Sequence, residues 1–217
     1  MLKLIPILLT LSMAASFPNE DWQLRKSKDG IDIYTRKVND TSVKSFKAVT
    51  SVQTSLSSLI ALVKHPEDSK KWIKNCGNAK TIEQLDFWHI VNYYQIDVNL
   101  LFFEDRDMVM ELDITQDPET LAVDIVMKNV PDYIEEKDGL FRVKILRGSW
   151  KLVPRGDSIE ITYELLFDPG GNIPAWLANL RVVSDPFNTL KKLHVLSKSE
   201  PYRNFRYDEI IEPSWIN

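Results

Sequence analysis

The stretch DPGGNIPAWLANLRVVSDPFNTLKKLHVL, residues 168–196, ends one expected strand and begins one long expected helix. The strand before it reads ITYELLFD over 161–168 and is rich in β-branched and aromatic residues. The run 169–171 stops that strand, because proline lacks a ladder donor and glycine permits a sharp turn. Asn172 suits a helix N-cap, and Pro174 suits the first helical position.

Large side chains of 173–196 recur at three- and four-residue steps and so share one helical face. These are Trp176, Leu180, Val183, Phe187, Leu190 and His194. Pro186 lies within the helix and removes a backbone hydrogen bond, which predicts a kink or break near 183–185. A long helix that follows a run of strands indicates a lid over a sheet.

The segments before this stretch predict helices first and serial strands after them. Helices are expected over 20–25, from Thr54 or Ser55 to Pro66, and over 68–75 with Gly77 as the C-cap. Strands are expected over 31–34, 43–52, 86–98, 107–115, 120–128, 140–146, 149–153 and 158–167. Short turns between strands indicate an antiparallel meander. We interpret residues 17–200 as one α+β domain, followed by an arm over 201–217 that packs on it or touches a membrane.

Composition and charge narrow the class of protein. The chain has 217 residues, of which 44% are hydrophobic and 27% charged, the balance of a globular protein. The net charge of −4 argues against nucleic acid as the main partner, because phosphate binding needs a basic face. A single cysteine, Cys76, excludes an intramolecular disulfide.

Residues 1–16 read MLKLIPILLTLSMAAS and have the order of a secretory signal peptide. Lys3 precedes an apolar run over 4–11, which is too short to span a membrane, and small residues follow it. We expect the signal to be removed and the protein to be exported to a bacterial periplasm or secreted. An uncleaved anchor or an irregular N-terminus is the alternative.

No motif for metal or nucleophilic chemistry occurs in the sequence. The three histidines, His65, His89 and His194, lie on different expected elements, with no second ligand at metal spacing. Each is expected to be a hydrogen-bonded core residue. We therefore expect no metal site and no cofactor.

The segment LLFFEDRD, residues 100–107, places four apolar residues between two strands, where a polar connection is usual. It is either a loop tip that covers a cavity mouth or touches a membrane, or a buried strand end. The charged residues after it could form a cluster at such a mouth. An exposed ion pair there would contribute little stability.

Arg142 lies in the apolar strand LFRVKIL, on the face shared with Leu140, Lys144 and Leu146. One interpretation is a solvated face, which Lys144 favours. The other is a cation that faces a cavity and holds a carboxylate or phosphate head group.

Several short pieces, taken in order, resemble one known family. They are Trp22 followed by DGIDIYTR at 29–36, FKA at 46–48, Trp72 with Cys76, the pair Tyr93 and Tyr94, EDRDMV at 104–109, FRV at 141–143, GSW at 148–150, and the long run 168–193. Together, over about residues 21–198, they resemble the START (steroidogenic-acute-regulatory-protein-related lipid-transfer) family, in a bacterial exported form. Single pieces are weakly specific, and their order makes the set specific.

The resemblance implies a helix-grip (START/Bet v 1-like) fold, in which a curved antiparallel sheet surrounds a hydrophobic tunnel closed by the C-terminal helix. It implies one lipid per domain, no catalysis, and a gate formed by 173–196 and 99–105. The expected ligand is a sterol, a phospholipid or a fatty-acid-like molecule. Its expected contacts are Trp72, Tyr94, Leu101, Phe102, Phe103, Arg106, Asp107, Arg142, Trp150, Trp176, Leu180, Val183, Phe187 and Leu190.

The sequence thus predicts a non-enzymatic lipid-binding or lipid-transfer protein, monomeric, with transient membrane contact. An enzyme on the same fold is the first alternative, with His89 and either Asp97 or Tyr94 as its acid–base pair. A lipid sensor or interaction module is the second. Lipid transfer between vesicles would separate the sensor from the carrier.

Overall fold

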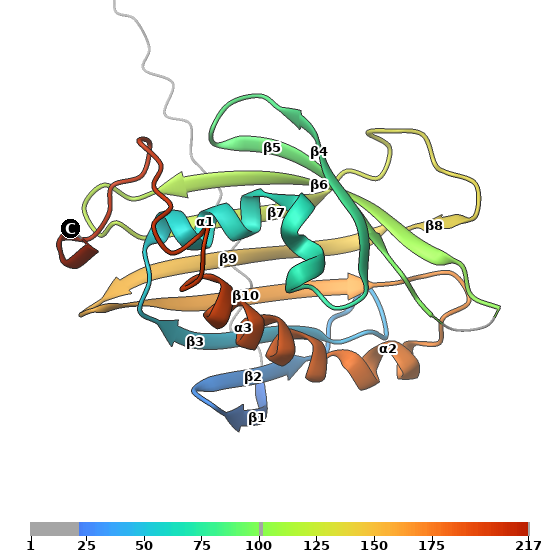
Figure 1. Cartoon of the computed structure of the whole chain (residues 1–217). Coiled ribbons are helices and arrows are strands. Elements are labelled where there is room, and N and C mark those ends of the chain that lie inside the picture. The colour runs from blue at the N-terminus through green and yellow to red at the C-terminus, as the bar shows by residue number, and fades with distance from the viewer. Residues whose placement is uncertain (1–21, 100–101, 217) are drawn as a thin grey trace, which may run out of the picture.

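A curved sheet and a pair of C-terminal helices form the body of the computed structural model, which describes residues 22–99 and 102–216 (Figure 1). The strands are β1 (Gln23–Lys28), β2 (Ile31–Arg36), β3 (Ser45–Val52), β4 (Cys76–Gln84), β5 (His89–Ile96), β6 (Asp105–Gln116), β7 (Val123–Asn129), β8 (Leu140–Arg142), β9 (Ile145–Arg155) and β10 (Ser158–Asp168). The helices are α1 (Leu56–Lys64), the 3-10 helix η1 (Pro66–Lys71), α2 (Ala175–Arg181), α3 (Ser184–Leu196) and the 3-10 helix η2 (Ser214–Ile216).

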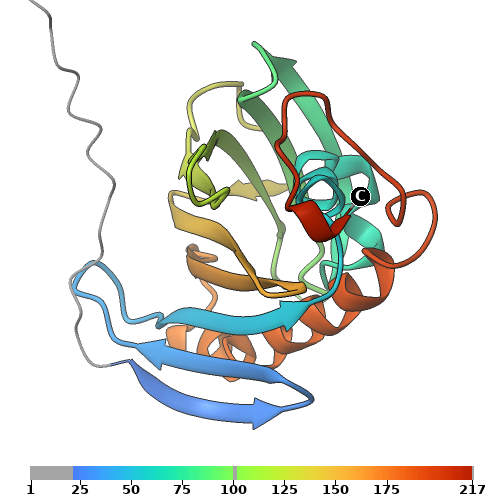
Figure 2. The same cartoon turned by 90° about the vertical axis from the view of Figure 1, so that its left-hand side faces the viewer.

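Neighbouring strands lie in the order β1-β2-β3-β10-β9-β7-β6-β5-β4, and every pair along this path is antiparallel. The short strand β8 pairs in parallel with β6 outside the path. Between β3 and β4 the chain forms α1 and η1, so β3 pairs with β10 instead. Figure 2 shows the sheet bending around the helices. The predicted α+β class with a curved antiparallel sheet is confirmed.

The predicted break in the long helix is confirmed, and it separates α2 from α3 at residues 182–183. The cause is Pro186, whose ring clashes with the carbonyl group four residues earlier, on Val182. The predicted start of the helix is wrong in detail: Pro174 takes the N-cap position, and its cap has no side-chain hydrogen bond from Asn172.

Two predicted helices are wrong, and one strand was missed. In place of a helix over 20–25, the described residues Gln23 to Arg25 belong to β1, because the Asp29–Gly30 turn closes a hairpin with β2. Six residues are too few to form a stable helix alone. The helix expected over 68–75 is the shorter η1, and Gly77 lies in β4. The strand β4 was not predicted, since an edge strand that is half exposed lacks a strong apolar alternation.

Helix α1 is buried along its whole length between the sheet and residues 201–216. Ser55 caps it as predicted, with its hydroxyl oxygen accepting a hydrogen bond from the Ser58 amide at 3.1 Å. The Glu212 carboxylate accepts hydrogen bonds from two further amides of the first turn, at 2.9 and 2.8 Å. The C-terminal arm therefore satisfies a helix end that would otherwise be buried unpaired.

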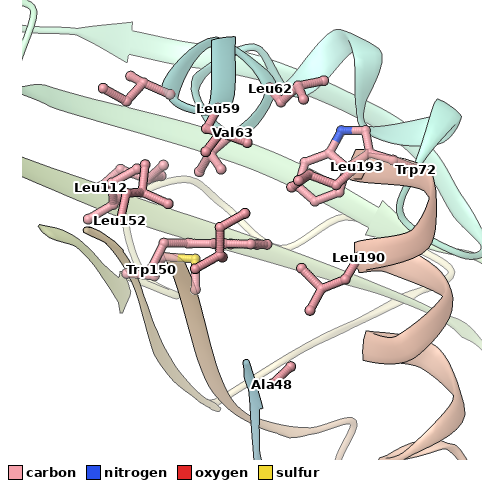
Figure 3. Close-up of a cluster of buried hydrophobic side chains, with 14 of the residues drawn as sticks. Ala48, Leu59, Leu62, Val63, Trp72, Leu112, Trp150, Leu152, Leu190 and Leu193 are labelled. Atoms are coloured by element: carbon pink, nitrogen blue, oxygen red, sulfur yellow. The ribbon is translucent and has the colours of Figure 1, made fainter. Parts of the chain in front are cut away.

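The hydrophobic core lies between the concave face of the sheet, α1 and α3. Figure 3 shows Val63 of α1 pointing toward Trp150 of β9, while Leu190 and Leu193 of α3 enter from the opposite side. These four side chains are at most 5% exposed, and the same cluster includes Trp72 after η1. Alternate residues of the strands face this space, which follows from the two-residue period of a strand.

Raising the pH from 8 to 9.5 is expected to stabilise the protein through Lys64, the last residue of α1. Its ammonium group lies 3.5 Å from the centre of the Phe87 ring and donates a 2.7 Å hydrogen bond to the Phe87 carbonyl. Burial lowers the pKa of Lys64 from its ordinary value of 10.5 to about 8. Between these two values the unfolded chain holds a proton that the folded chain has lost, so unfolding becomes harder as pH rises.

The measurement is urea unfolding at pH 7.5, 8.5 and 9.5 of the wild type and of Lys64→Met. The stability of the wild type should increase with pH relative to the variant. Lys191→Met, which removes an exposed lysine, is the control and should follow the wild type. Parallel curves for the wild type and Lys64→Met would contradict the prediction.

Candidate functional site

A cavity of about 600 Å³ lies between the concave face of the sheet and helices α2 and α3. Its wall is mainly apolar and aromatic, with side chains from both halves of the sheet, from the residues after η1 and from α2. Ligand pockets in proteins commonly enclose about 300–1,000 Å³ and have a largely apolar lining with a few polar groups. The cavity therefore has the size and the wall of a site for a small apolar molecule.

Strand β6 forms one side of the wall through its two-residue period. Met108, Met110 and Leu112 face the cavity, and so does Arg106 at the start of the strand. The residues between them face the opposite side of the sheet. Methionine suits such a wall, because its unbranched side chain adapts to ligands of irregular shape.

An aromatic group lines the inner part of the cavity. The rings of Trp150 and Tyr163 are stacked, with centroids 3.8 Å apart and planes 7° from parallel, and Trp72 meets Trp150 edge-on at 6.0 Å. Tyr94 completes this group. Burial raises the pKa of Tyr94 and of Tyr163, so both phenols remain neutral at physiological pH.

Arg106 is a cation in the cavity wall, with only 1% of its surface exposed. Its guanidinium donates hydrogen bonds to the carbonyl oxygens of Pro169 at 3.1 Å, Gly170 at 3.0 Å, and Glu104. These bonds tie the turn after β10 to the start of β6. Burial lowers the pKa of Arg106, and within the described residues no carboxylate forms a salt bridge with it.

Helix α2 covers the cavity and has no buried residue of its own. Its Leu177 and Ala178 line the space beneath it. Asn179 fastens it to the segment between β2 and β3: its side-chain oxygen accepts from the Lys44 amide at 2.8 Å, and its NH₂ donates to the Ser42 carbonyl at 3.0 Å. The cover is therefore held mainly by polar contacts rather than by a packed core.

Charged side chains gather where the cavity opens, between the residues after η1 and the junction of α2 and α3. Asp185 lies 3.7 Å from the Lys74 ammonium group and 3.6 Å from the Arg181 guanidinium. All three residues line the cavity and are partly exposed. Sequence reasoning missed them, since they are far apart along the chain and lie in no recognisable motif.

The predicted ligand contacts fall into several groups in the structure. Trp72, Tyr94, Arg106, Trp150 and Leu180 line the cavity. Phe102 and Trp176 are exposed by 95% and 66%. Phe187 and Leu190 are core residues outside the lining, and Val183 packs against that core. Phe103 is partly buried and also lies outside the lining. Leu101 lies outside the described residues. A role in ligand binding remains a prediction for the whole set.

Asp107 and Arg142 lie on the convex face of the sheet, away from the cavity. The solvated-face interpretation of Arg142 is wrong, because both side chains are fully buried and form a two-pronged salt bridge of 2.8 and 3.0 Å. The interpretation that Arg142 faces the cavity is not supported either. The register pairs Asp107 of β6 directly with Arg142 of β8, and the segment 130–139 covers them.

The histidines lie outside the cavity lining. His65 and His194 are partly buried and hydrogen-bonded, to the Tyr207 hydroxyl and the Thr50 hydroxyl, both at 3.1 Å. The expectation of a core residue is wrong for His89, which is exposed and bonds to Asp86 on the surface. Within residues 22–99 and 102–216 no cluster of possible metal ligands occurs, and no helix there has the length and hydropathy to cross a membrane.

A curved sheet that encloses an apolar cavity under a C-terminal helix defines the helix-grip class of ligand-binding proteins. The START domain family matches residues 10–197, and the chain belongs to this family. It therefore contains a START lipid-transfer domain, as the motif order predicts.

Relatives of known sequence or structure extend this assignment. An uncharacterized protein of Pseudomonas aeruginosa is 37% identical over 177 residues, which cover 80% of this chain and 85% of the relative. Phosphatidylcholine transfer protein of Rattus norvegicus is 29% identical over 166 residues, covering 73% and 75%. The crystal structure of a STAR-related lipid transfer protein fragment from Xanthomonas axonopodis superimposes with a TM-score of 0.76 at 26% identity, covering 82% of this chain and 99% of that one. The predicted fold and the bacterial relatives are thus confirmed.

Proposed function

We propose that this protein is a non-enzymatic carrier that holds one lipid-like ligand in the cavity beneath α2. The observation that carries the proposal is the 600 Å³ space with its mainly apolar and aromatic wall. An apolar chain that enters it gains about 0.8 kcal/mol for each CH₂ group removed from water. Relatives named as lipid transfer proteins support the same conclusion.

The enzyme alternative has little support in the geometry of the site. It requires an acid–base pair that faces the bound molecule. His89, its candidate base, is exposed on the surface and is absent from the cavity lining. Tyr94 does line the cavity, but burial raises the pKa of its phenol, so the group stays protonated and cannot accept a proton as a phenolate.

Native mass spectrometry of the purified protein tests the proposal. We expect one lipid-sized adduct per monomer, which organic extraction would release for identification. The same spectrum tests our expectation of a monomer. A protein without an adduct that also takes up no lipid from an offered panel would contradict the proposed function.

Carrier and sensor differ in what the ligand does after binding. A carrier moves labelled lipid from donor to acceptor vesicles at a rate that increases with protein concentration. A sensor binds the same lipid without accelerating its transfer. We expect acceleration, because α2 has no buried residue to lock it over the cavity.

We also propose transient contact with a membrane through the exposed apolar residues near α2. Replacing Phe102 and Trp176 together by alanine is expected to lower vesicle binding and lipid transfer about 10-fold, because both side chains are largely exposed and could enter the lipid surface. The measurement is vesicle co-sedimentation alongside the transfer assay. Leu85→Ala, an equally apolar exposed residue on the turn between β4 and β5, is the control and should have no effect. Equal losses in both variants would contradict the proposed contact.

Export is a proposal that rests on the signal-like pattern of residues 1–16. We expect the protein in the periplasmic or secreted fraction, with its N-terminus shortened by about 16 residues. Intact mass of the purified protein measures the cleavage, and cell fractionation measures the location. A full-length protein in the cytoplasm would contradict the proposal.

A further inference from the structure

The volume of the cavity limits the size of the ligand. A dry apolar cavity of about 150 Å³ holds benzene, so a bound heavy atom needs roughly 25 Å³. On this scale, 600 Å³ accommodates roughly 24 heavy atoms. A single chain such as hexadecanoate, with about 18 heavy atoms, fits, whereas a two-chain phospholipid of about 50 heavy atoms exceeds the space.

The two ends of the cavity differ in polarity. Arg106 and Leu112 both line it and are six residues apart on β6, a separation of about 20 Å. Around Leu112, Trp150 and Val63 no charged side chain of the described residues lines the wall. The ligand's apolar chain therefore belongs at this inner end.

The end of the cavity near Arg106 is charged, and its net charge is positive. Arg106 on β6 is paired with Ile96 on β5, which is in turn paired with Cys76 on β4. Lys74 is in the turn just before Cys76, so this turn lies about two strand spacings from Arg106. Among the described residues that line the cavity, the cations are Lys74, Arg106 and Arg181, and Asp185 is the one carboxylate. Two positive charges remain after Asp185 is neutralised.

Arg106 has hydrogen-bonding capacity left for a ligand. A guanidinium carries five N–H donors, and three of these bond to backbone carbonyl oxygens. Carbonyl groups satisfy these three donors, and the nearby carboxylates of Glu104 and Asp105 act on the charge through space without forming a salt bridge with it among the described residues. A buried cation of this kind favours a carboxylate or phosphate partner, which forms short charge-assisted bonds with it.

We propose that the ligand is a single-chain anionic amphiphile, with its carboxylate or phosphate head at Arg106, Lys74 and Arg181 and its chain toward Trp150. This inference rests on the proposed carrier function and narrows it to one ligand class. A zwitterionic head at the inner end would bury its phosphate far from any cation of the lining, which is unfavourable because the desolvated charge has no partner. A neutral alcohol would offer the free donors of Arg106 no charge-assisted hydrogen bond.

Titration of the delipidated protein with hexadecyl probes tests the class of head group. Hexadecanoate and hexadecyl phosphate distinguish the two acidic heads, hexadecanol is the neutral match, and hexadecyltrimethylammonium is the cationic match. Tryptophan fluorescence reports binding, because Trp72 and Trp150 line the cavity. We expect at least one acid to bind about 10-fold or more tightly than hexadecanol, in line with charge-assisted hydrogen bonds.

Variants test where the head lies. Lys74→Gln combined with Arg181→Gln should weaken binding of the acid about 3- to 10-fold and leave hexadecanol unchanged, since these side chains are at the exposed mouth. Arg106→Gln should remove most of the preference for acid, with urea unfolding used to verify its fold. The control, Lys198→Gln with Arg203→Gln, removes the same charge from exposed cations after α3 and should change nothing.

The outcomes separate this inference from the proposed function. The proposed ligand class would be overturned if hexadecanol or the ammonium probe bound more tightly than the acids. It would also be overturned if the protein took up phosphatidylcholine stoichiometrically from vesicles in preference to the acids. Either result would leave the proposed carrier function standing. An acid preference that survives in both mouth and Arg106 variants would overturn the placement of the head. Absence of binding for every probe, together with absence of a native adduct, would overturn the carrier function as well.

Discussion

Replacing Arg142 by methionine is expected to lower the free energy of unfolding by about 3–5 kcal/mol, the usual cost of leaving one partner of a buried ion pair alone. The guanidinium donates to both carboxylate oxygens of Asp107, at 2.8 and 3.0 Å, and neither side chain is exposed. It also donates to the carbonyl oxygens of Pro131, Ile134 and Glu135 in the covering segment. The change therefore leaves a buried carboxylate without its counter-ion and three carbonyl groups without their hydrogen-bond donor.

Urea unfolding followed by circular dichroism measures this loss. Lys151→Met is the matched control, because Lys151 and Asp124 form an exposed cross-strand pair at 3.0 Å that should contribute less than about 1 kcal/mol. Adding Asp107→Leu to Arg142→Met should recover part of the loss, since no lone charge remains buried. A loss in Arg142→Met as small as that of the control would contradict the assigned role.

Trp150→Ala is the second change with a large expected effect, a loss of about 3–5 kcal/mol in the free energy of unfolding. The indole is 2% exposed, stacks on Tyr163 and contacts the edge of Trp72. Its removal leaves a hole that the surrounding strands cannot close. Because Trp150 also lines the cavity, the hole should enlarge the ligand space and admit a bulkier apolar molecule.

Unfolding in urea measures the stability of Trp150→Ala, and native mass spectrometry of the bound ligand measures its selectivity. Trp150→Phe is the matched control, because a phenyl ring retains an aromatic face opposite Tyr163 and fills most of the hole. We expect it to lose less than half as much stability and to keep the wild-type ligand. A stable Trp150→Ala protein with unchanged ligand selectivity would show that Trp150 is not part of a close-packed wall.

Predictions that depended on local backbone chemistry agree best with the structure. The Ser55 cap, the Asp29–Gly30 hairpin and the break before Pro186 each follow from a few neighbouring residues. Predictions that depended on helical period in short segments failed, as at 20–25 and 68–75. At 20–25 the pairing of a strand with its neighbour outweighs a weak local preference, and at 68–75 the helical turns end at Lys71.

Two features of the site were within reach of sequence reasoning. The alternation of apolar residues along β6 places Met108, Met110 and Leu112 on one face, and the aromatic residues Trp72 and Trp150 were predicted as ligand contacts on the basis of family motifs. The placement of Arg142 was not within reach. A two-residue period assigns a side chain to one of two faces, but the neighbouring strands and loops decide whether that face is solvent, core or cavity.

The sequence by itself determined the α+β class, the two-part terminal helix and membership of the START family. Those properties are set by short-range backbone preferences and by motifs that remain in fixed order. Only the tertiary structure decided that the space under α2 is hollow, that Asp107 pairs with Arg142 on the far face, and that Lys74 and Arg181 meet at Asp185. The physical reason is that cavities, their openings and buried ion pairs are formed by residues that are distant in sequence. Strand register and helix packing fix the distances between these residues in space.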